Sequence, residues 1–181
     1  EEALERILSH FDVLDAEEKP LLGALGQVLA EDVVAPFDVP PWDNSAMDGY
    51  AVRAADIAGA SASSPRTLRV IGEAPAGRVF SGTVEPGAAV RIMTGAPTPR
   101  GADTVVPFEE TDEMEQRRGQ GRITEIAILK ALGSGANIRS AGEDILRGTT
   151  VLEAGMVLRP AEIGVLASVG KARARVVRRP V

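Results

Sequence analysis

The sequence contains no cysteine and only one histidine, His10. The absence of cysteine excludes a disulfide scaffold, a thiol nucleophile and a zinc site built on thiolates. A single imidazole cannot form a multi-histidine metal site within one chain. No apolar stretch approaches the roughly 20 residues of a transmembrane helix, so we expect no membrane partner.

Aromatic residues are also scarce, at 3% of the chain. Any core must therefore be aliphatic, built from Val, Ile, Leu and Ala. A carbohydrate-binding β domain is a weak candidate, because so few rings offer little surface on which a sugar face can stack. The aromatic residues are Phe11, Phe37, Trp42, Tyr50, Phe80 and Phe108.

The remaining composition is that of a globular protein. Its 181 residues are enough for one large domain or two small ones, and 44% are apolar and 25% charged. The formal net charge is −6, which argues against a nucleic-acid partner because such a protein needs a basic face. The basic residues of segment 171–179 lack interleaved aromatics and indicate the solvent face of a terminal strand.

Apolar spacing predicts helices over residues 1–8 and 21–29. A third helix is expected over residues 160–168, because Pro160 suits a first helical position and Gly170 suits the position past a helix end.

Between these helices, short runs separated by Gly and Pro turns predict strands. The expected fold is mainly β with a few α-helices. A β-rich, barrel-like domain over 43–136 is inserted into a small mixed α/β domain made of 1–42 and 137–181. The predicted strands are 32–35, 50–52, 67–71, 88–93, 104–108, 123–129, 144–146, 150–152 and 171–179.

The densest polar turn spans residues 43–50, with the sequence DNSAMDGY. Asn, Ser, Asp and Gly favour turns, so one interpretation is a structural turn that enters a strand. The other is a loop that presents Asp48 as a cation ligand or charge anchor, with Gly49 allowing another group to approach the backbone. Composition alone favours the structural interpretation.

A second rigid turn follows a predicted strand at residues 91–99, with the sequence RIMTGAPTP. Thr94 could hydrogen-bond an oxyanion or a substrate hydroxyl, although a Thr that closes its own turn is the commoner case. This turn is not a P-loop, because the Gly-Lys-Ser/Thr ending is missing.

Two charged segments allow both a structural and a functional interpretation. The acidic run 109–115 could bind a hard cation, but like-charge repulsion favours an extended, solvated loop. Arg139 stands close in sequence to Glu143 and Asp144, so an internal ion pair is the default interpretation. Capture of a phosphate or another oxyanion by Arg139 is the alternative.

Five segments in order along the chain resemble the molybdopterin molybdenumtransferase family, which includes bacterial MoeA and the E domain of gephyrin. Together they cover nearly the whole chain, and a chance match to all five is implausible. The segments are PWDNSAMDGYAV at 41–52, RIMTGAP at 91–97, GADTVV at 101–106, NIR with GED within 137–144, and AEIGVLASVG at 161–170.

The resemblance implies a function in molybdenum cofactor biosynthesis. Members insert molybdate into adenylylated molybdopterin and release AMP, assisted by Mg²⁺ or another divalent cation. They are elongated cytoplasmic homodimers. Their β-rich domain is inserted into a linking domain, and the active cleft lies between this β-rich domain and a cofactor-binding α/β domain of the other subunit.

The resemblance also implies site residues. Asp48 and Thr94 match the family's functional positions, with Asp48 holding the cation and Thr94 positioning substrate. The expected substrate-binding residues are Asn44, Ser45, Gly49, Gly95 and Arg139.

Departures from the family pattern define what the chain itself is expected to do. Trp42 stands where the family commonly has Phe. The motifs of the cofactor-binding domain and of the small C-terminal domain are not found in the chain. We therefore expect an enzyme as the parent protein, and an isolated chain that is inactive but supplies dimerisation and one wall of the cleft. The alternative is a non-catalytic scaffold or interaction module that keeps the fold.

Overall fold

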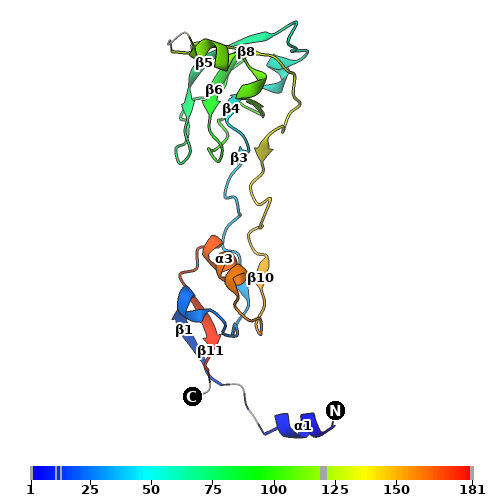
Figure 1. The fold of residues 1–181 in the computed structure, drawn as a ribbon, viewed down its shortest axis with the longest axis vertical. Coiled ribbons are helices and arrows are strands. Elements are labelled where there is room, and N and C mark those ends of the chain that lie inside the picture. The colour runs from blue at the N-terminus through cyan, green and yellow to red at the C-terminus, as the bar shows by residue number, and fades with distance from the viewer. Residues whose placement is uncertain (1, 11, 13, 119–121, 180–181) are drawn as a thin grey trace. The chain divides into compact units, whose positions relative to one another are not determined.

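The computed structural model describes residues 2–10, 12, 14–118 and 122–179. The chain forms two compact units, each with its own core (Figure 1). Unit 1 comprises Glu1–Val39 and Asp144–Val181, and unit 2 comprises Pro40–Glu143. The boundaries expected from the sequence lie at residues 42/43 and 136/137.

Unit 1 combines short helices with two two-stranded antiparallel pairs, β1 with β11 and β2 with β10. Helix α1 contributes no buried residue. The elements are α1 (Glu2–Leu8), β1 (Ala16–Pro20), the 3₁₀ turn η1 (Leu21–Ala24), β2 (Val33–Val34), β10 (Thr150–Leu152), α3 (Pro160–Ser168) and β11 (Arg173–Val177).

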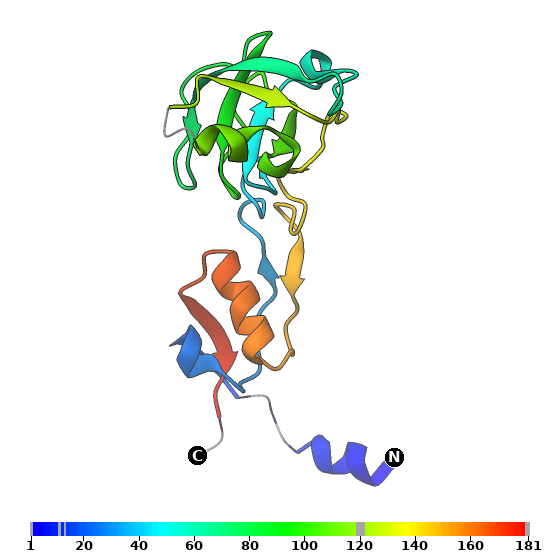
Figure 2. The same cartoon turned by 45° about the horizontal axis from the view of Figure 1, so that its top comes forward.

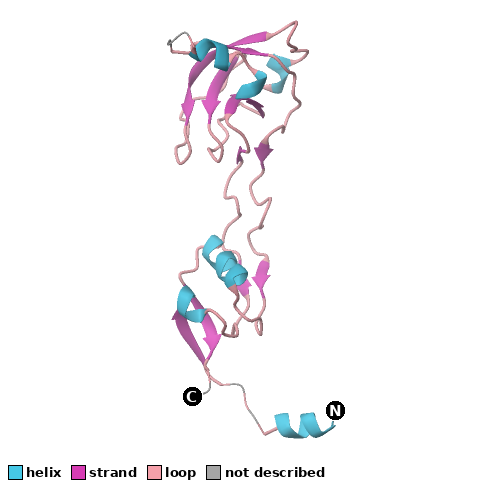
Figure 3. Ribbon diagram, in the orientation of Figure 1, coloured by secondary structure: helices cyan, strands magenta, loops and turns pink. Residues whose placement is uncertain are grey.

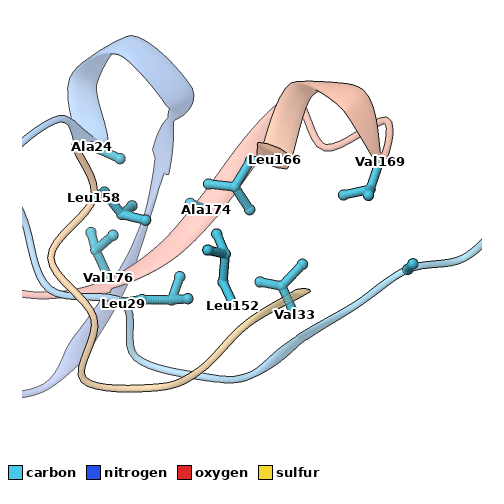
Figure 4. Close-up of a cluster of buried hydrophobic side chains, with 10 residues drawn as sticks. Ala24, Leu29, Val33, Leu152, Leu158, Leu166, Val169, Ala174 and Val176 are labelled. Atoms are coloured by element: carbon cyan, nitrogen blue, oxygen red, sulfur yellow. The ribbon is translucent and has the colours of Figure 1, made fainter. Parts of the chain in front are cut away.

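Helix α3 begins and ends where its sequence predicts. Pro160 occupies the first turn, and the Glu162 carboxylate accepts the Arg159 N–H at 2.9 Å. Gly170 adopts a φ of 77°, which only glycine tolerates easily. The helix directs Leu166 into an aliphatic core shared with Leu152 and Val176 (Figure 4).

The prediction of a helix over 21–29 is wrong. Only the 3₁₀ turn η1 forms, because Gly26 adopts a φ of 74° and its N–H donates to the Leu158 carbonyl. Leu29 then donates to the Met156 carbonyl, so tertiary pairing replaces the helical ladder. The strand expected at 144–146 is reduced to one bridge between Ile145 and Val39.

Unit 2 is built on a five-stranded sheet in the order β7-β4-β6-β5-β8, curled into a half-barrel (Figures 2 and 3). Every neighbouring pair is antiparallel except β5 and β6. The elements are β3 (Asn44–Ser45), β4 (Gly49–Val52), η2 (Ala54–Ile57), β5 (Arg66–Ala74), β6 (Ala88–Ile92), β7 (Thr104–Pro107), η3 (Phe108–Glu110), α2 (Glu113–Arg117), β8 (Glu125–Ile128) and β9 (Ile138–Arg139).

The two central strands β4 and β6 are buried along their whole length. They separate two hydrophobic clusters, one around Ile57 and Ile126 and the other around Val90 and Ile92. The predicted fold class, mainly β with a few α-helices, is confirmed. The sheet positions two polar turns, one that precedes β4 and one that follows β6.

The prediction that residues 109–115 form an extended, solvated loop is wrong. They fold into η3 and the start of α2, and Glu113 is only 1% exposed. The buried guanidinium of Arg91 offsets the negative charge of the Glu113 carboxylate.

Candidate functional site

Backbone hydrogen bonds bring the polar turn 43–48 against the turn that follows β6. Ser45 donates to the Ala96 carbonyl at 3.0 Å, and Gly95 donates back to the Ser45 carbonyl at 2.8 Å. Since Gly49 of β4 stands opposite Ile92 of β6, the start of β4 and the end of β6 lie at the same edge of the sheet. Two segments far apart in sequence thus form one polar edge.

Asp48 and Thr94 are joined directly at this edge. Asp48 Oδ1 accepts hydrogen bonds from the Thr94 N–H and from Thr94 Oγ1, each at 2.7 Å. The Thr94 N–H, followed by its hydroxyl, holds the pKa of Asp48 below its ordinary value of 3.8. The carboxylate is therefore anionic at neutral pH, half-buried, and next to an exposed Thr94.

The two expected site glycines serve different purposes. A Cβ on Gly49 would lie 2.0 Å from the Val106 carbonyl oxygen, so the close approach of β4 to β7 requires glycine there. Gly95 has a φ of 79° with no atom within 4 Å of an added Cβ, which leaves open space beside Thr94.

Asn44 and Ser45 are buried, at 6% and 0% exposure. Ser45 Oγ donates to the Met47 carbonyl at 2.6 Å, and Asn44 Nδ2 donates to the Trp42 carbonyl at 3.3 Å. These contacts favour a structural role for both side chains, and their expected contact with substrate stays a prediction.

Arg139 is exposed on β9, whose backbone pairs it with Asn44 of β3. None of the ion pairs among the described residues involves Arg139, so the prediction of an internal ion pair with Glu143 or Asp144 is wrong. The Glu143 carboxylate instead accepts the Ser140 N–H at 3.1 Å, which closes a local turn. The Arg139 guanidinium thus remains exposed on the segment that borders Asn44.

A charge cluster around the buried Glu113 carboxylate was not predicted from the sequence. Arg91 Nε lies 2.8 Å from Glu113 Oε2, an ion pair without hydrogen-bond alignment, and Arg117 Nε lies 2.6 Å from Glu113 Oε1. The Arg91 guanidinium carbon lies 5.5 Å from the Tyr50 ring centre and 5.7 Å from that of Phe108. Burial, and then the adjacent Glu113 carboxylate, raise the pKa of Tyr50.

One signal for this cluster was present in the sequence. Arg91 interrupts the otherwise apolar strand AAVRIM, and a buried guanidinium requires a partner. Nothing distinguishes Glu113 from the other carboxylates of its acidic run, so the partner could not be named.

A divalent cation fits this edge of the sheet if substrate supplies part of its coordination shell. Within the described ranges, no three His, Cys, Asp or Glu residues cluster in a metal-binding arrangement. Mg²⁺ is often held by one or two carboxylates together with water and substrate phosphates. Asp48 fits that pattern. Within the described part of the chain its hydrogen bonds are accepted by Oδ1, so Oδ2 can coordinate a cation.

No helix in the described part of the chain has the length and apolar character needed to cross a bilayer.

Both the sequence and the fold of the chain match known proteins. The family described as "MoeA N-terminal region (domain I and II)" matches residues 1–170. Molybdopterin molybdenumtransferase 2 of Mycobacterium tuberculosis is 48% identical over 153 residues, 84% of this chain and 36% of that protein. Molybdopterin molybdenumtransferase of Staphylococcus aureus is 39% identical over 179 residues, 99% of this chain and 41% of that protein.

Among solved structures, the molybdopterin biosynthesis MoeA protein from Pyrococcus horikoshii OT3 superimposes with a TM-score of 0.87. Its sequence identity is 38%, and the match covers 99% of this chain and 45% of that one. The chain therefore spans less than half the length of the relatives it matches.

Proposed function

Because this chain belongs to the MoeA N-terminal family, we propose that the protein containing it inserts molybdate into adenylylated molybdopterin and releases AMP. The names of its relatives support a function in molybdenum cofactor biosynthesis. The observation that carries the finer proposal is the Asp48 carboxylate, which accepts two hydrogen bonds from Thr94 at the sheet edge and is oriented by them.

Each residue of the edge has a proposed task. Asp48 holds the divalent cation, which when bound offsets the negative charge of the substrate phosphates. Thr94 fixes the orientation of the Asp48 carboxylate through two hydrogen bonds and positions substrate beside it. Gly95 leaves room for substrate to approach the backbone, and Arg139 offers an exposed guanidinium to a phosphate.

The contribution of this chain to the whole enzyme is part of the proposal. It supplies dimerisation and one wall of an active cleft, and a cofactor-binding α/β domain supplies the other wall. The isolated chain is then inactive. A homodimer and a cytoplasmic location belong to the same proposal.

The test uses the complete gene product that contains residues 1–181, incubated with molybdopterin-AMP, Mg²⁺ and molybdate. We expect AMP release that requires molybdate. A complete gene product that folds and dimerises but releases no AMP would contradict the proposal and favour the non-catalytic scaffold.

Assembly is tested separately by sedimentation equilibrium of the 181-residue chain, followed by titration with molybdopterin-AMP. We expect a dimer that binds the ligand weakly or not at all. A monomer with measurable affinity would contradict the proposal, because the β-rich unit would then be a binding unit by itself.

A further inference from the structure

We propose that Arg91, held in place by Glu113, is a positioning residue for the Asp48–Thr94 pair. The inference deepens the proposed function and rests on it for its meaning in catalysis. Arg91 Nη1 donates to the Gly49 carbonyl at 3.2 Å and to the Ile92 carbonyl at 2.8 Å. One nitrogen atom therefore joins the first residue of β4 to the last residue of β6.

These two carbonyls lie next to the site in sequence. Gly49 directly follows Asp48, and Ile92 lies two residues before Thr94. The Asp48–Thr94 hydrogen bonds span the same two segments, 2.7 Å in each case. A shift of either strand end would lengthen them. The guanidinium therefore adds to the backbone pairing of Gly49 with Ile92 in holding the separation on which both bonds depend.

Glu113 keeps the guanidinium in place. Its side chain is 2% exposed and that of Arg91 is 8% exposed, so water solvates neither charge well. The Tyr50 and Phe108 rings further confine the Arg91 head group. Buried ion pairs add little net stability compared with apolar replacements. The Arg91–Glu113 pair therefore serves positioning more than stability, through the hydrogen bonds of Arg91 to the Gly49 and Ile92 carbonyls.

Arg91→Lys separates geometry from charge. Lysine keeps the positive charge, but its single ammonium cannot reproduce the forked geometry that reaches Glu113 and two carbonyls. Arg69→Lys is the matched control, since Arg69 is exposed on the neighbouring strand β5. Glu113→Gln is the second variant, because it retains the shape of the side chain and removes the charge that holds Arg91.

The first readout is NMR on the 181-residue chain. In Arg91→Lys we expect hydrogen exchange at the Thr94 amide to become about tenfold faster, as for loss of about one net hydrogen bond. The Val106 amide, which lies in β7, reports whether the sheet itself has loosened, and its exchange should stay unchanged.

The second readout is catalysis by the complete gene product, where Arg91→Lys should lower kcat more than it raises KM for molybdopterin-AMP. Absence of activity in the wild type would refute the proposed function while NMR still decides the positioning inference. A folded Arg91→Lys chain with unchanged hydrogen exchange at the Thr94 amide would overturn the positioning inference. If that variant does not fold, Glu113→Gln decides by the same readouts. Unfolding of both variants would mark the pair as purely structural and also overturn it.

Discussion

Gly49→Ala should destabilise unit 2 strongly, because β4 and β7 leave no space for a methyl group at this position. The added Cβ would lie 2.0 Å from the Val106 carbonyl oxygen and 2.9 Å from Pro107 Cα. It would need to move about 1.4 Å to reach an ordinary contact of about 3.4 Å. These obstacles are backbone atoms, so a change of rotamer cannot relieve the clash.

The size of the stability loss follows from the β4–β7 hydrogen-bond ladder, which must open to admit the methyl group. Gly49 begins the β4–β7 register, which continues to the pair of Val52 with Thr104. Overpacking a filled interior costs about 1–3 kcal/mol, and each ladder hydrogen bond lost adds about 1 kcal/mol. We expect a loss of about 3 kcal/mol or more, a large part of the 5–15 kcal/mol that typically stabilises a domain.

Urea unfolding followed by far-UV circular dichroism measures this loss of stability. Gly133→Ala is the matched control, because an added Cβ there meets nothing within 4 Å and the residue has no positive φ. That control should change stability by less than about 1 kcal/mol. A Gly49→Ala chain as stable as the control would refute the packing argument.

Three further predictions concern Asp48, Thr94 and the core of unit 1. Since the folded-state pKa of Asp48 is lowered, its stabilising contribution is present above the ordinary value of 3.8 and is lost as pH falls through the folded-state value. The stability difference between wild type and Asp48→Asn should therefore shrink in acid, as measured by urea unfolding from pH 6 down to about pH 2; a pH-independent difference would contradict this. Thr94→Val should raise the pKa of Asp48 only part of the way to its ordinary value, because the variant keeps the Thr94 N–H, which contributes more than the hydroxyl. An NMR titration that shows no rise would exclude the hydroxyl contact. Leu166→Ala should cost about 2–5 kcal/mol by leaving a cavity in unit 1, whereas Leu22→Ala, at 86% exposure, should cost little; equal losses in circular dichroism melts would contradict the core assignment.

Local chemistry made part of the fold predictable from the sequence. Helix α3 forms over the predicted residues because Pro160, Glu162 and Gly170 mark both of its ends within the chain's own sequence. Strand β6 follows from an apolar run that must be buried. In both cases the determining interactions are short-range.

Elements that depend on distant partners were missed. Strand β1 has the sequence AEEKP, whose residues are poor strand formers, and it is extended because β11 pairs with it. The apolar spacing of 21–29 predicts a helix, but the Leu158 and Met156 carbonyls accept its N–H groups instead. Local propensity lost to tertiary pairing in each case.

The site, like the fold, was predictable where local sequence determines it and not where distant partners do. The turns that carry Asp48 and Thr94 were identified from their residue types and from the family resemblance, whereas their direct hydrogen bonds depend on the pairing of β4 with β6. The burial of Glu113 depends on Arg91, 22 positions earlier in the sequence, and no pattern in the acidic run indicates it.

The most direct test of the account compares molybdate-dependent AMP release by Asp48→Asn and Asp56→Asn in the complete gene product. Asp56 is the matched control, because it is also half-buried in unit 2 and also accepts a distant backbone N–H, that of Gly87 at 2.9 Å. We expect Asp48→Asn to lose at least about 10- to 100-fold in activity, the range seen when a partner that only orients a metal ligand is removed, and Asp56→Asn to keep its activity. Undiminished AMP release by a folded Asp48→Asn variant would contradict the central claim.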